Sequence, residues 1–167
     1  MSDACLFSDG SVDTKTGIGY GAYLLVEDTN KALLQTLSSR LLLKQFTSTS
    51  STKLELETLL WALEEVMPQL NELNSNLTIY TDSQNIVGLP SRRQRLERNN
   101  YYARNNTRLA NYLLYQKFYR FSDQMNFELV KVKGHKKSSQ RSEIYQYFAL
   151  VDQASRQALR ESKTHSA

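Results

Sequence analysis

Short apolar runs separated by turn residues occupy the first third of the chain, and this pattern predicts β-strands. An apolar run at residues 4–8 stops at a turn cluster over residues 9–11. Residues 18–26 are rich in tyrosine and aliphatic side chains, and a turn at residues 28–30 allows residues 31–43 to return as a third strand. We therefore expect a meander of three strands in this region.

After residue 50 the apolar pattern changes to a helical period. Between residues 51 and 70, apolar side chains recur about every 3.6 residues, and Thr52 and Glu55 have the spacing of a capping box. Further along, the pattern predicts a strand at residues 77–81, a helix near 106–121, a strand at 127–132 and a helix near 142–162. This order predicts an α/β (α+β) fold in which helices flank a five-stranded mixed sheet.

The composition is typical of one soluble domain. The chain has 167 residues, of which 40% are hydrophobic, and we expect a single domain over residues 1–167, with its core at 4–162 and a short flexible C-terminal tail. Cys5 is the only cysteine, which excludes an internal disulfide framework and a cysteine-based zinc cluster. No signal peptide and no apolar run long enough to span a bilayer is visible. We therefore expect a cytoplasmic monomer that does not bind membranes.

Positive charge is concentrated in one segment. Residues 92–120 contain eight Lys or Arg and one Glu, a net charge of +7, whereas the whole chain has a net charge of +4. The same segment contains five tyrosines, and this combination favours contacts with phosphates, sugars and bases of a nucleic acid. The alternative is a solvated helix face whose tyrosines pack inward. A second, smaller basic cluster covers residues 131–141.

Two aspartates follow strands in the same sequence context. Asp9 and Asp82 each come after an apolar run and before small polar residues. If the two strands are parallel neighbours, both side chains lie at the carboxyl edge of the sheet, where open α/β sheets place their sites. The alternative is that each aspartate only forms a turn or caps a helix.

Two further carboxylates lie at the margins of apolar helix stripes. Glu55 lies about 40° from the nearest apolar position of the first helix, and Asp152 lies at the edge of the stripe of the last helix. The alternatives are a capping-box role for Glu55 and an ordinary surface position for Asp152.

Four carboxylates brought together repel one another unless a cation neutralises them. Their oxygens select Mg²⁺ or Mn²⁺. Two such ions about 4 Å apart can activate water and stabilise the leaving oxygen in phosphodiester cleavage. His135, in a basic loop after a strand, can shuttle a proton in such a site, although a lone loop histidine is more often inert.

Taken in order, these motifs resemble type 1 ribonuclease H over residues 4 to about 160. The matching segments are Asp9-Gly10-Ser11, Lys53-Leu54-Glu55-Leu56, Tyr80-Thr81-Asp82-Ser83-Gln84, Val132-Lys133-Gly134-His135 and Val151-Asp152-Gln153-Ala154-Ser155. The resemblance implies a ribonuclease H-like fold. It also implies an endoribonuclease that hydrolyses the RNA strand of RNA–DNA hybrids with Mg²⁺ or Mn²⁺, using two ions and leaving 5′-phosphate and 3′-hydroxyl ends.

The resemblance also assigns roles to residues. It implies that the metal-binding catalytic carboxylates are Asp9, Glu55, Asp82 and Asp152, and that His135 is a mobile catalytic auxiliary. It places the basic protrusion that holds the DNA strand in the segment with Arg92, Arg93 and Arg95. It implies minor-groove contacts, which distinguish RNA by its 2′-hydroxyls, near Gly10, Ser11, Ser51, Thr52 and Gln84.

The chain departs from the family pattern at two points. Ser51 and Thr52 stand where the family commonly has asparagines, and the gap from His135 to Asp152 is 17 residues, longer than usual. Two other functions compete with the hydrolase. One is a catalytically silent nucleic-acid-binding module of the same fold, and the other is a different phosphodiesterase of the superfold. Ser11 disfavours a proofreading exonuclease, which usually has an acid at that position.

Overall fold

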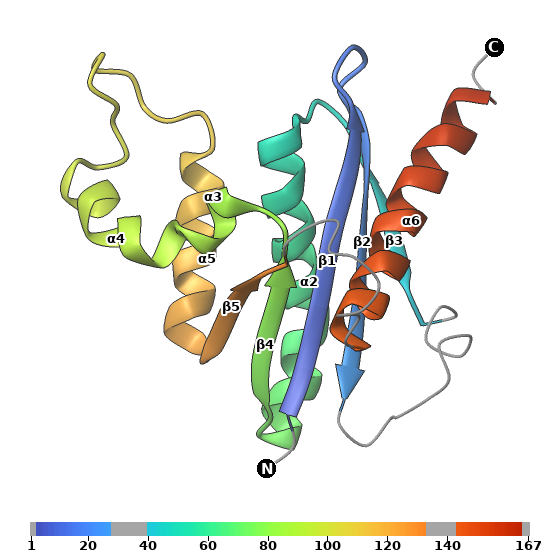
Figure 1. Cartoon of the computed structure of the whole chain (residues 1–167). Coiled ribbons are helices and arrows are strands. Elements are labelled where there is room, and N and C mark those ends of the chain that lie inside the picture. Colours follow the sequence, from blue (N-terminus) through green and yellow to red (C-terminus); the bar gives the residue numbers. More distant parts are fainter. Residues whose placement is uncertain (1–2, 28–39, 133–142, 165–167) are drawn as a thin grey trace.

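A mixed sheet with strand order β3-β2-β1-β4-β5 runs through the centre of the molecule (Figure 1). The computed structural model describes residues 3–27, 40–132 and 143–164. Within them the strands are β1 (Asp3–Asp13), β2 (Ile18–Glu27), β3 (Leu42–Phe46), β4 (Asn76–Thr81) and β5 (Phe127–Lys131). The helices are α2 (Ser51–Leu73), α3 (Gln84–Val87), α4 (Leu89–Arg98), α5 (Tyr112–Gln124) and α6 (Glu143–Thr164). None of these helices is long and apolar enough to cross a membrane.

The strand pairing confirms the predicted mixed sheet. β1 pairs antiparallel with β2, and β2 pairs antiparallel with β3. On its other side β1 pairs parallel with β4, which in turn pairs parallel with β5. Because β1 and β4 are parallel neighbours, the end of β4 lies beside the middle of β1.

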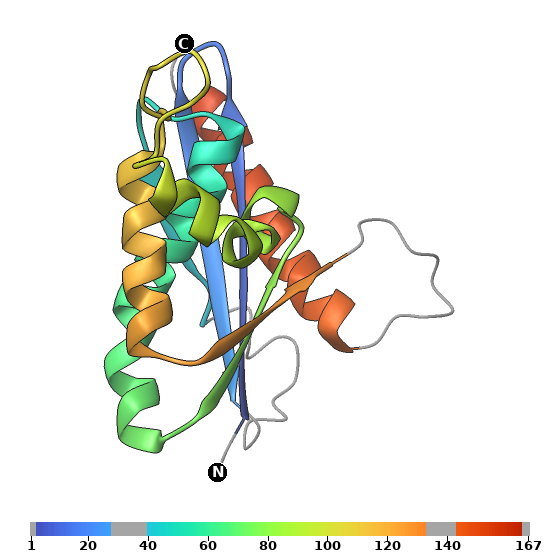
Figure 2. The ribbon, with the colours of Figure 1, turned by 90° about the vertical axis from the view of Figure 1, so that its left-hand side faces the viewer.

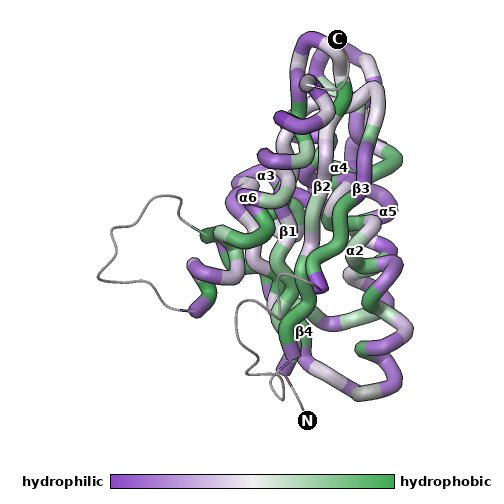
Figure 3. The backbone as a smooth tube through the Cα atoms, turned by 90° about the vertical axis from the view of Figure 1, so that its right-hand side faces the viewer, coloured by the Kyte–Doolittle hydropathy of each residue, from purple (hydrophilic) through white to green (hydrophobic). Residues whose placement is uncertain are grey.

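Helices cover both faces of the sheet. Figure 2 shows α2 and α5 on one face and α6 on the other. The apolar residues gather along the central strands and on the helix faces that pack against them (Figure 3). One core cluster joins α2 and α5 to the sheet, and a second joins α6 to β1 and β2.

Glycines allow the start of α2 to approach the sheet closely. A Cβ at Gly10 would lie 2.9 Å from the Leu54 side chain, and one at Gly19 would lie 2.7 Å from it. A Cβ at Gly21 would collide with the side chain of Thr58. The small residues that the sequence shows in β1 and β2 therefore bring the first turns of α2, and with them Glu55, against β1.

Three local predictions differ from what the structure shows. Residues 9–11 do not form a turn but continue β1, paired with residues 20–22 of β2, because the antiparallel partner extends as far as β1 does. The third strand is β3, which overlaps the predicted range 31–43 only at its last two residues and extends to Phe46; residues 28–39, with the expected turn at 28–30, lie outside the described residues. β3 is an edge strand with mostly exposed side chains, so its sequence does not show the apolar pattern that would predict where it begins and ends.

The third concerns the capping box. The N-cap of α2 is Ser50, whose hydroxyl accepts a hydrogen bond from the Lys53 backbone N–H. Thr52 is therefore inside the helix, and Glu55 has no capping role. Its carboxylate is left available for the sheet edge.

The helices after β4 also differ from the prediction. The helix expected at 106–121 is α5, which begins at Tyr112, and α3 and α4 were not predicted. In α4 only Leu89 and Leu96 are buried, which is too few apolar positions to produce a helical period.

Candidate active site

Three carboxylates meet where β4 ends beside β1. Asp9 lies within β1 and is only 3% exposed, Asp82 directly follows β4 at the solvent side, and Glu55 lies one turn into α2. One carboxylate oxygen of each lies within 4.8 Å of those of the other two. The structure thus brings together three of the four acidic residues that the sequence pattern selected.

The fourth carboxylate, Asp152, joins this group from α6. Its side chain is close enough to raise the pKa values of Asp9, Glu55 and Asp82. On its outer side Asp152 forms an ion pair with Arg156, with 3.0 Å between Oδ1 and Nε. Four segments that lie far apart in the sequence therefore place acidic side chains near one another, with Asp9, Glu55 and Asp82 in the tight group and Asp152 beside it.

Burial makes this cluster electrostatically unfavourable when all its members are charged. Burial, followed by the charge of Glu55, raises the pKa of Asp9. Burial, followed by the charge of Asp82, raises the pKa of Glu55. The pKa of Asp82 is also raised, by burial and then by Asp152, although Arg156 and Lys131 oppose this shift. The cluster therefore favours either protons or a cation.

The donor set fits a divalent metal ion. Among the described residues, the buried Oε2 of Glu55 has no hydrogen-bond partner. Buried polar atoms normally have one, so this oxygen is free to serve as a ligand. A group of carboxylate oxygens without sulfur or imidazole donors is the set that Mg²⁺ and Mn²⁺ prefer. The residues that would hold the metal are Asp9, Glu55, Asp82 and Asp152.

The residues expected to contact a minor groove lie near this cluster. Gly10, Ser11 and Ser51 line one open depression of about 650 Å³ beside Asp9. Thr52 is exposed in the first turn of α2. Gln84 begins α3, and its side-chain oxygen accepts a hydrogen bond from Lys131 at 3.1 Å. His135 lies outside the described residues.

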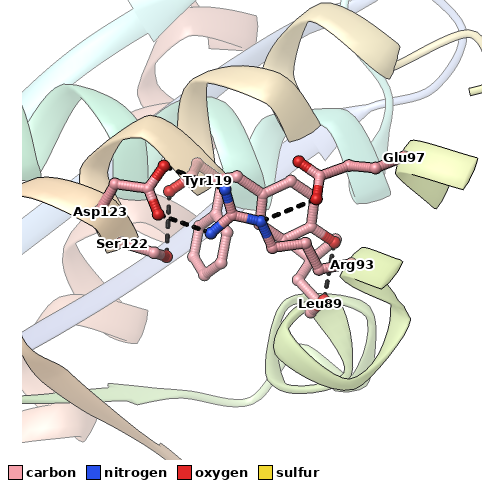
Figure 4. Close-up of polar contacts among 7 residues, drawn as sticks. Leu89, Arg93, Glu97, Tyr119, Ser122 and Asp123 are labelled. Atoms are coloured by element: carbon pink, nitrogen blue, oxygen red, sulfur yellow. Dashed lines mark hydrogen bonds and ion pairs between the residues drawn. The ribbon is translucent and has the colours of Figure 1, made fainter. Parts of the chain in front are cut away.

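Two arginines of the basic segment hold helices together. The Arg93 guanidinium donates to both carboxylate oxygens of Asp123, at 2.7 and 3.0 Å, and to Glu97 at 3.1 Å (Figure 4). It also stacks over the ring of Tyr119, whose hydroxyl donates to the Leu89 carbonyl at 2.7 Å. Arg93 therefore connects α4 to α5.

The neighbouring arginines differ in their contacts. Arg92 donates to the backbone carbonyl and the side-chain oxygen of Asn85, at 2.8 and 2.9 Å, and so joins α4 to α3. Arg95 is exposed in the last turn of α4 and forms no ion pair within the part of the chain that the structure describes. Arg95 is thus the member of the three whose charge is available at the surface.

Sequence reasoning missed two cations on the carboxylate side of α6, Arg156 and Arg160. Lys131, which ends β5, belongs to the second basic cluster that the sequence showed, at residues 131–141. The spacing of Asp152, Arg156 and Arg160 places them on one helix face, a signal that the sequence already contained. The position of Lys131 beside Asp82 carried no local signal, because it depends on the pairing of β4 with β5.

Comparison with known proteins gives a family and a fold. The RNase H family model matches residues 1–160. No curated protein sequence matches the chain. Among solved structures, a foamy viral protease-reverse transcriptase in complex with dsDNA has a TM-score of 0.65 and 11% identity, covering 91% of this chain and 93% of that one.

Two other structures have the same fold. A foamy viral protease-reverse transcriptase in complex with an RNA/DNA hybrid has a TM-score of 0.67 and 12% identity, with 92% of this chain and 19% of that chain covered. LC11-RNase H1, isolated from compost by a metagenomic approach, has a TM-score of 0.58 and 17% identity, with 95% of this chain and 99% of that chain covered. These likenesses confirm the predicted five-stranded mixed-sheet fold.

Proposed function

The chain belongs to the RNase H family of nucleases, and on this premise we propose that it hydrolyses the RNA strand of RNA–DNA hybrids. We propose that residues 1–167 form one domain. The proposed cofactor is Mg²⁺ or Mn²⁺, with two ions present when substrate is bound. The products carry 5′-phosphate and 3′-hydroxyl ends.

The observation that carries the proposal is the carboxylate cluster. Asp9, Glu55 and Asp82 place oxygens within 4.8 Å of one another, and the buried Oε2 of Glu55 has no partner among the described residues. A module that only binds nucleic acid gains nothing from such a cluster, because its negative charge repels phosphates.

Each acidic residue has a distinct part in the proposed reaction. Divalent ions held by these carboxylates would supply Lewis-acid stabilisation of the developing charge and would make a water more acidic. Asp9, held rigid inside β1, fixes the centre of the ligand set. Glu55 on α2 and Asp82 after β4 would supply further metal ligands, and Asp152 on α6 would supply the fourth. His135 is proposed as the auxiliary that moves a proton or assists product release.

Residues around the cluster support a hybrid as the substrate. Gly10, Ser11 and Ser51 lie beside Asp9 and present small backbone and hydroxyl groups, which can contact the 2′-hydroxyls of an RNA strand in a minor groove. Thr52 and Gln84 are proposed for the same groove. A structurally similar foamy viral protein has been solved with an RNA/DNA hybrid, which is consistent with this substrate class.

The test compares labelled RNA–DNA hybrid, double-stranded RNA and double-stranded DNA side by side. We expect cleavage of the RNA strand of the hybrid with Mg²⁺ or Mn²⁺ and no cleavage with EDTA. Metal-independent cleavage, or equal cleavage of duplex RNA, would contradict the proposal. Hybrid binding without cleavage in either metal would favour the silent binding module instead.

The basic segment gives a prediction that separates two kinds of arginine. Arg95→Ala is expected to weaken hybrid binding and to reduce the slope of log affinity against log salt by about one, because one phosphate contact is lost. Arg93→Ala removes the connection between α4 and α5, so we expect a lower melting temperature. Its direct effect on the slope should be small, since its charge is already paired with Asp123 and Glu97.

Fluorescence anisotropy of labelled hybrid at several salt concentrations checks this prediction. The measurement uses the Asp82→Asn chain as background, in which the substrate stays intact. A slope unchanged by Arg95→Ala, or flattened equally by Arg93→Ala, would show that the roles of these two arginines are assigned wrongly.

A further inference from the structure

A basic depression adjoins the carboxylate cluster on the side of α6. It has a volume of about 650 Å³ and lies between the C-terminal end of β1, the start of α2 and the C-terminal half of α6. We call it the α6 groove and define it by its polar lining residues, which are Ser11, Thr14, Ser51, Arg156 and Arg160. No acidic side chain of the described residues lines it.

The two arginines have different environments. Arg156 is fixed at the edge of the carboxylate cluster by its ion pair with Asp152. Arg160 follows one turn later on the same helix face and is exposed, and no carboxylate in the described ranges forms an ion pair with it. Four residues of helix rise about 6 Å, which is comparable with the separation of successive phosphates along one strand. Arg160 thus offers an unpaired positive charge one helical turn, about 6 Å, beyond Arg156, which lies at the edge of the cluster.

The opposite wall of the α6 groove supplies hydroxyl groups. Ser11 lies two residues after Asp9 in β1, and its Oγ is 3.2 Å from the Oγ of Ser155 on α6. Ser51 is the first residue of α2. Hydroxyls and arginines around one depression are the groups that bind phosphate and sugar oxygens in protein–nucleic acid interfaces. The negative charge of the carboxylate cluster repels an anionic ligand, whereas the arginines and hydroxyls that line the α6 groove do not.

The end of α6 is held in place beside this site. Lys163 forms an ion pair with Asp13 at the end of β1, at 3.8 Å. The α6 groove therefore lies between the Arg156–Asp152 pair, which is internal to α6, and the Lys163–Asp13 pair, which joins α6 to β1.

We propose that the α6 groove binds a backbone phosphate of the RNA strand next to the phosphate that is cleaved, with Arg160 supplying the charge. This inference rests on the proposed function. The groove begins at Gly10 and Ser11, directly beside Asp9, so the strand positioned at the carboxylates is the strand that continues into it. Figure 1 shows α4 and α6 on opposite sides of β1 and β4, so the two basic surfaces contact different parts of the duplex.

The test places single neutral linkages in the RNA strand. A 2′-deoxy methylphosphonate linkage is moved position by position along that strand, with a 2′-deoxy phosphate linkage as the control at each position. Binding is measured with the Asp82→Asn chain, alone and combined with Arg160→Ala, Arg160→Lys or Lys44→Ala. Lys44 is the matched control, since it lies on the edge strand β3, over the rings of Phe46 and Trp61.

We expect one position near the cleavage site at which the neutral linkage weakens binding by about three- to tenfold. Arg160→Ala should weaken binding of the unmodified hybrid by a similar factor and should remove the sensitivity at that position. Arg160→Lys should retain most of the affinity, and Lys44→Ala should change it by less than about twofold.

Equal sensitivity with and without Arg160, or sensitivity confined to the DNA strand, would overturn the inference. If the unmodified chain cleaves hybrid but gives either of these results, only the role of the α6 groove fails. If it neither binds nor cleaves hybrid, the proposed function fails, and this inference fails with it.

Discussion

Replacing Glu55 by glutamine is expected to lower the rate of hybrid cleavage by about a thousandfold or more, with the fold unchanged. Glutamine keeps the shape of the side chain, but it removes the negative charge and one of the two equivalent oxygens. Loss of a metal ligand removes several kcal/mol of charge stabilisation in the transition state, and about 1.4 kcal/mol corresponds to a factor of ten in rate.

The matched control is Glu72→Gln, the same substitution further along α2. Glu72 is exposed near the far end of that helix, so its removal should leave the rate within about twofold of the unmodified chain. The measurement is single-turnover cleavage of labelled hybrid in Mg²⁺, with circular dichroism to check folding. A folded Glu55→Gln chain that cleaves at the normal rate would remove Glu55 from the site.

Replacing Asp9 by asparagine is expected to stabilise the metal-free protein while abolishing its activity. The pKa of Asp9 is raised in the folded chain, first by burial and then by Glu55. The folded state therefore holds this proton more tightly than the unfolded state does, and stability is lost as pH rises above about 4, the ordinary value of an aspartate. Asparagine cannot ionise, so at pH 7 we expect the free energy of unfolding to rise by about 1–3 kcal/mol.

Thermal unfolding between pH 5 and pH 8, in EDTA and in Mg²⁺ or Mn²⁺, checks this prediction. In EDTA, the melting temperature of the unmodified chain should fall as pH rises, because Asp9 loses its proton, and metal should raise the melting temperature. The melting temperature of the Asp9→Asn chain should depend less on pH and less on metal. Asp123→Asn is the opposite control, because Arg93 lowers the pKa of that carboxyl and its loss should destabilise the chain. A destabilised Asp9→Asn chain that still responds to metal would contradict the assignment.

The sequence predicted the acidic cluster well because two independent constraints agree. Asp82 follows an apolar strand, and β1 and β4 are parallel neighbours as the element order suggested. The expected reason for the position of Asp9 was wrong, since it lies inside β1 rather than at its end. It still reaches Asp82 because β4 is shorter than β1, and strand lengths are set by pairing partners rather than by local composition.

The internal contacts of the basic segment could not be predicted from the sequence. Its charge and tyrosine content predicted a nucleic-acid surface, but composition does not say which arginine is paired within the protein. Arg93 is paired with Asp123, 30 residues away in the sequence, a contact that depends on how α4 packs on α5. The α6 groove likewise joins residues from β1, α2 and α6, and its formation depends on the tertiary fold.

The most direct test of a metal site at these carboxylates is anomalous scattering from crystals of the unmodified chain soaked in Mn²⁺. The account predicts that the strongest anomalous peak lies among the carboxylate oxygens of Asp9, Glu55 and Asp82, in contact with at least two of these side chains. Manganese bound only elsewhere on the protein, with this cluster empty at saturating Mn²⁺, would contradict it.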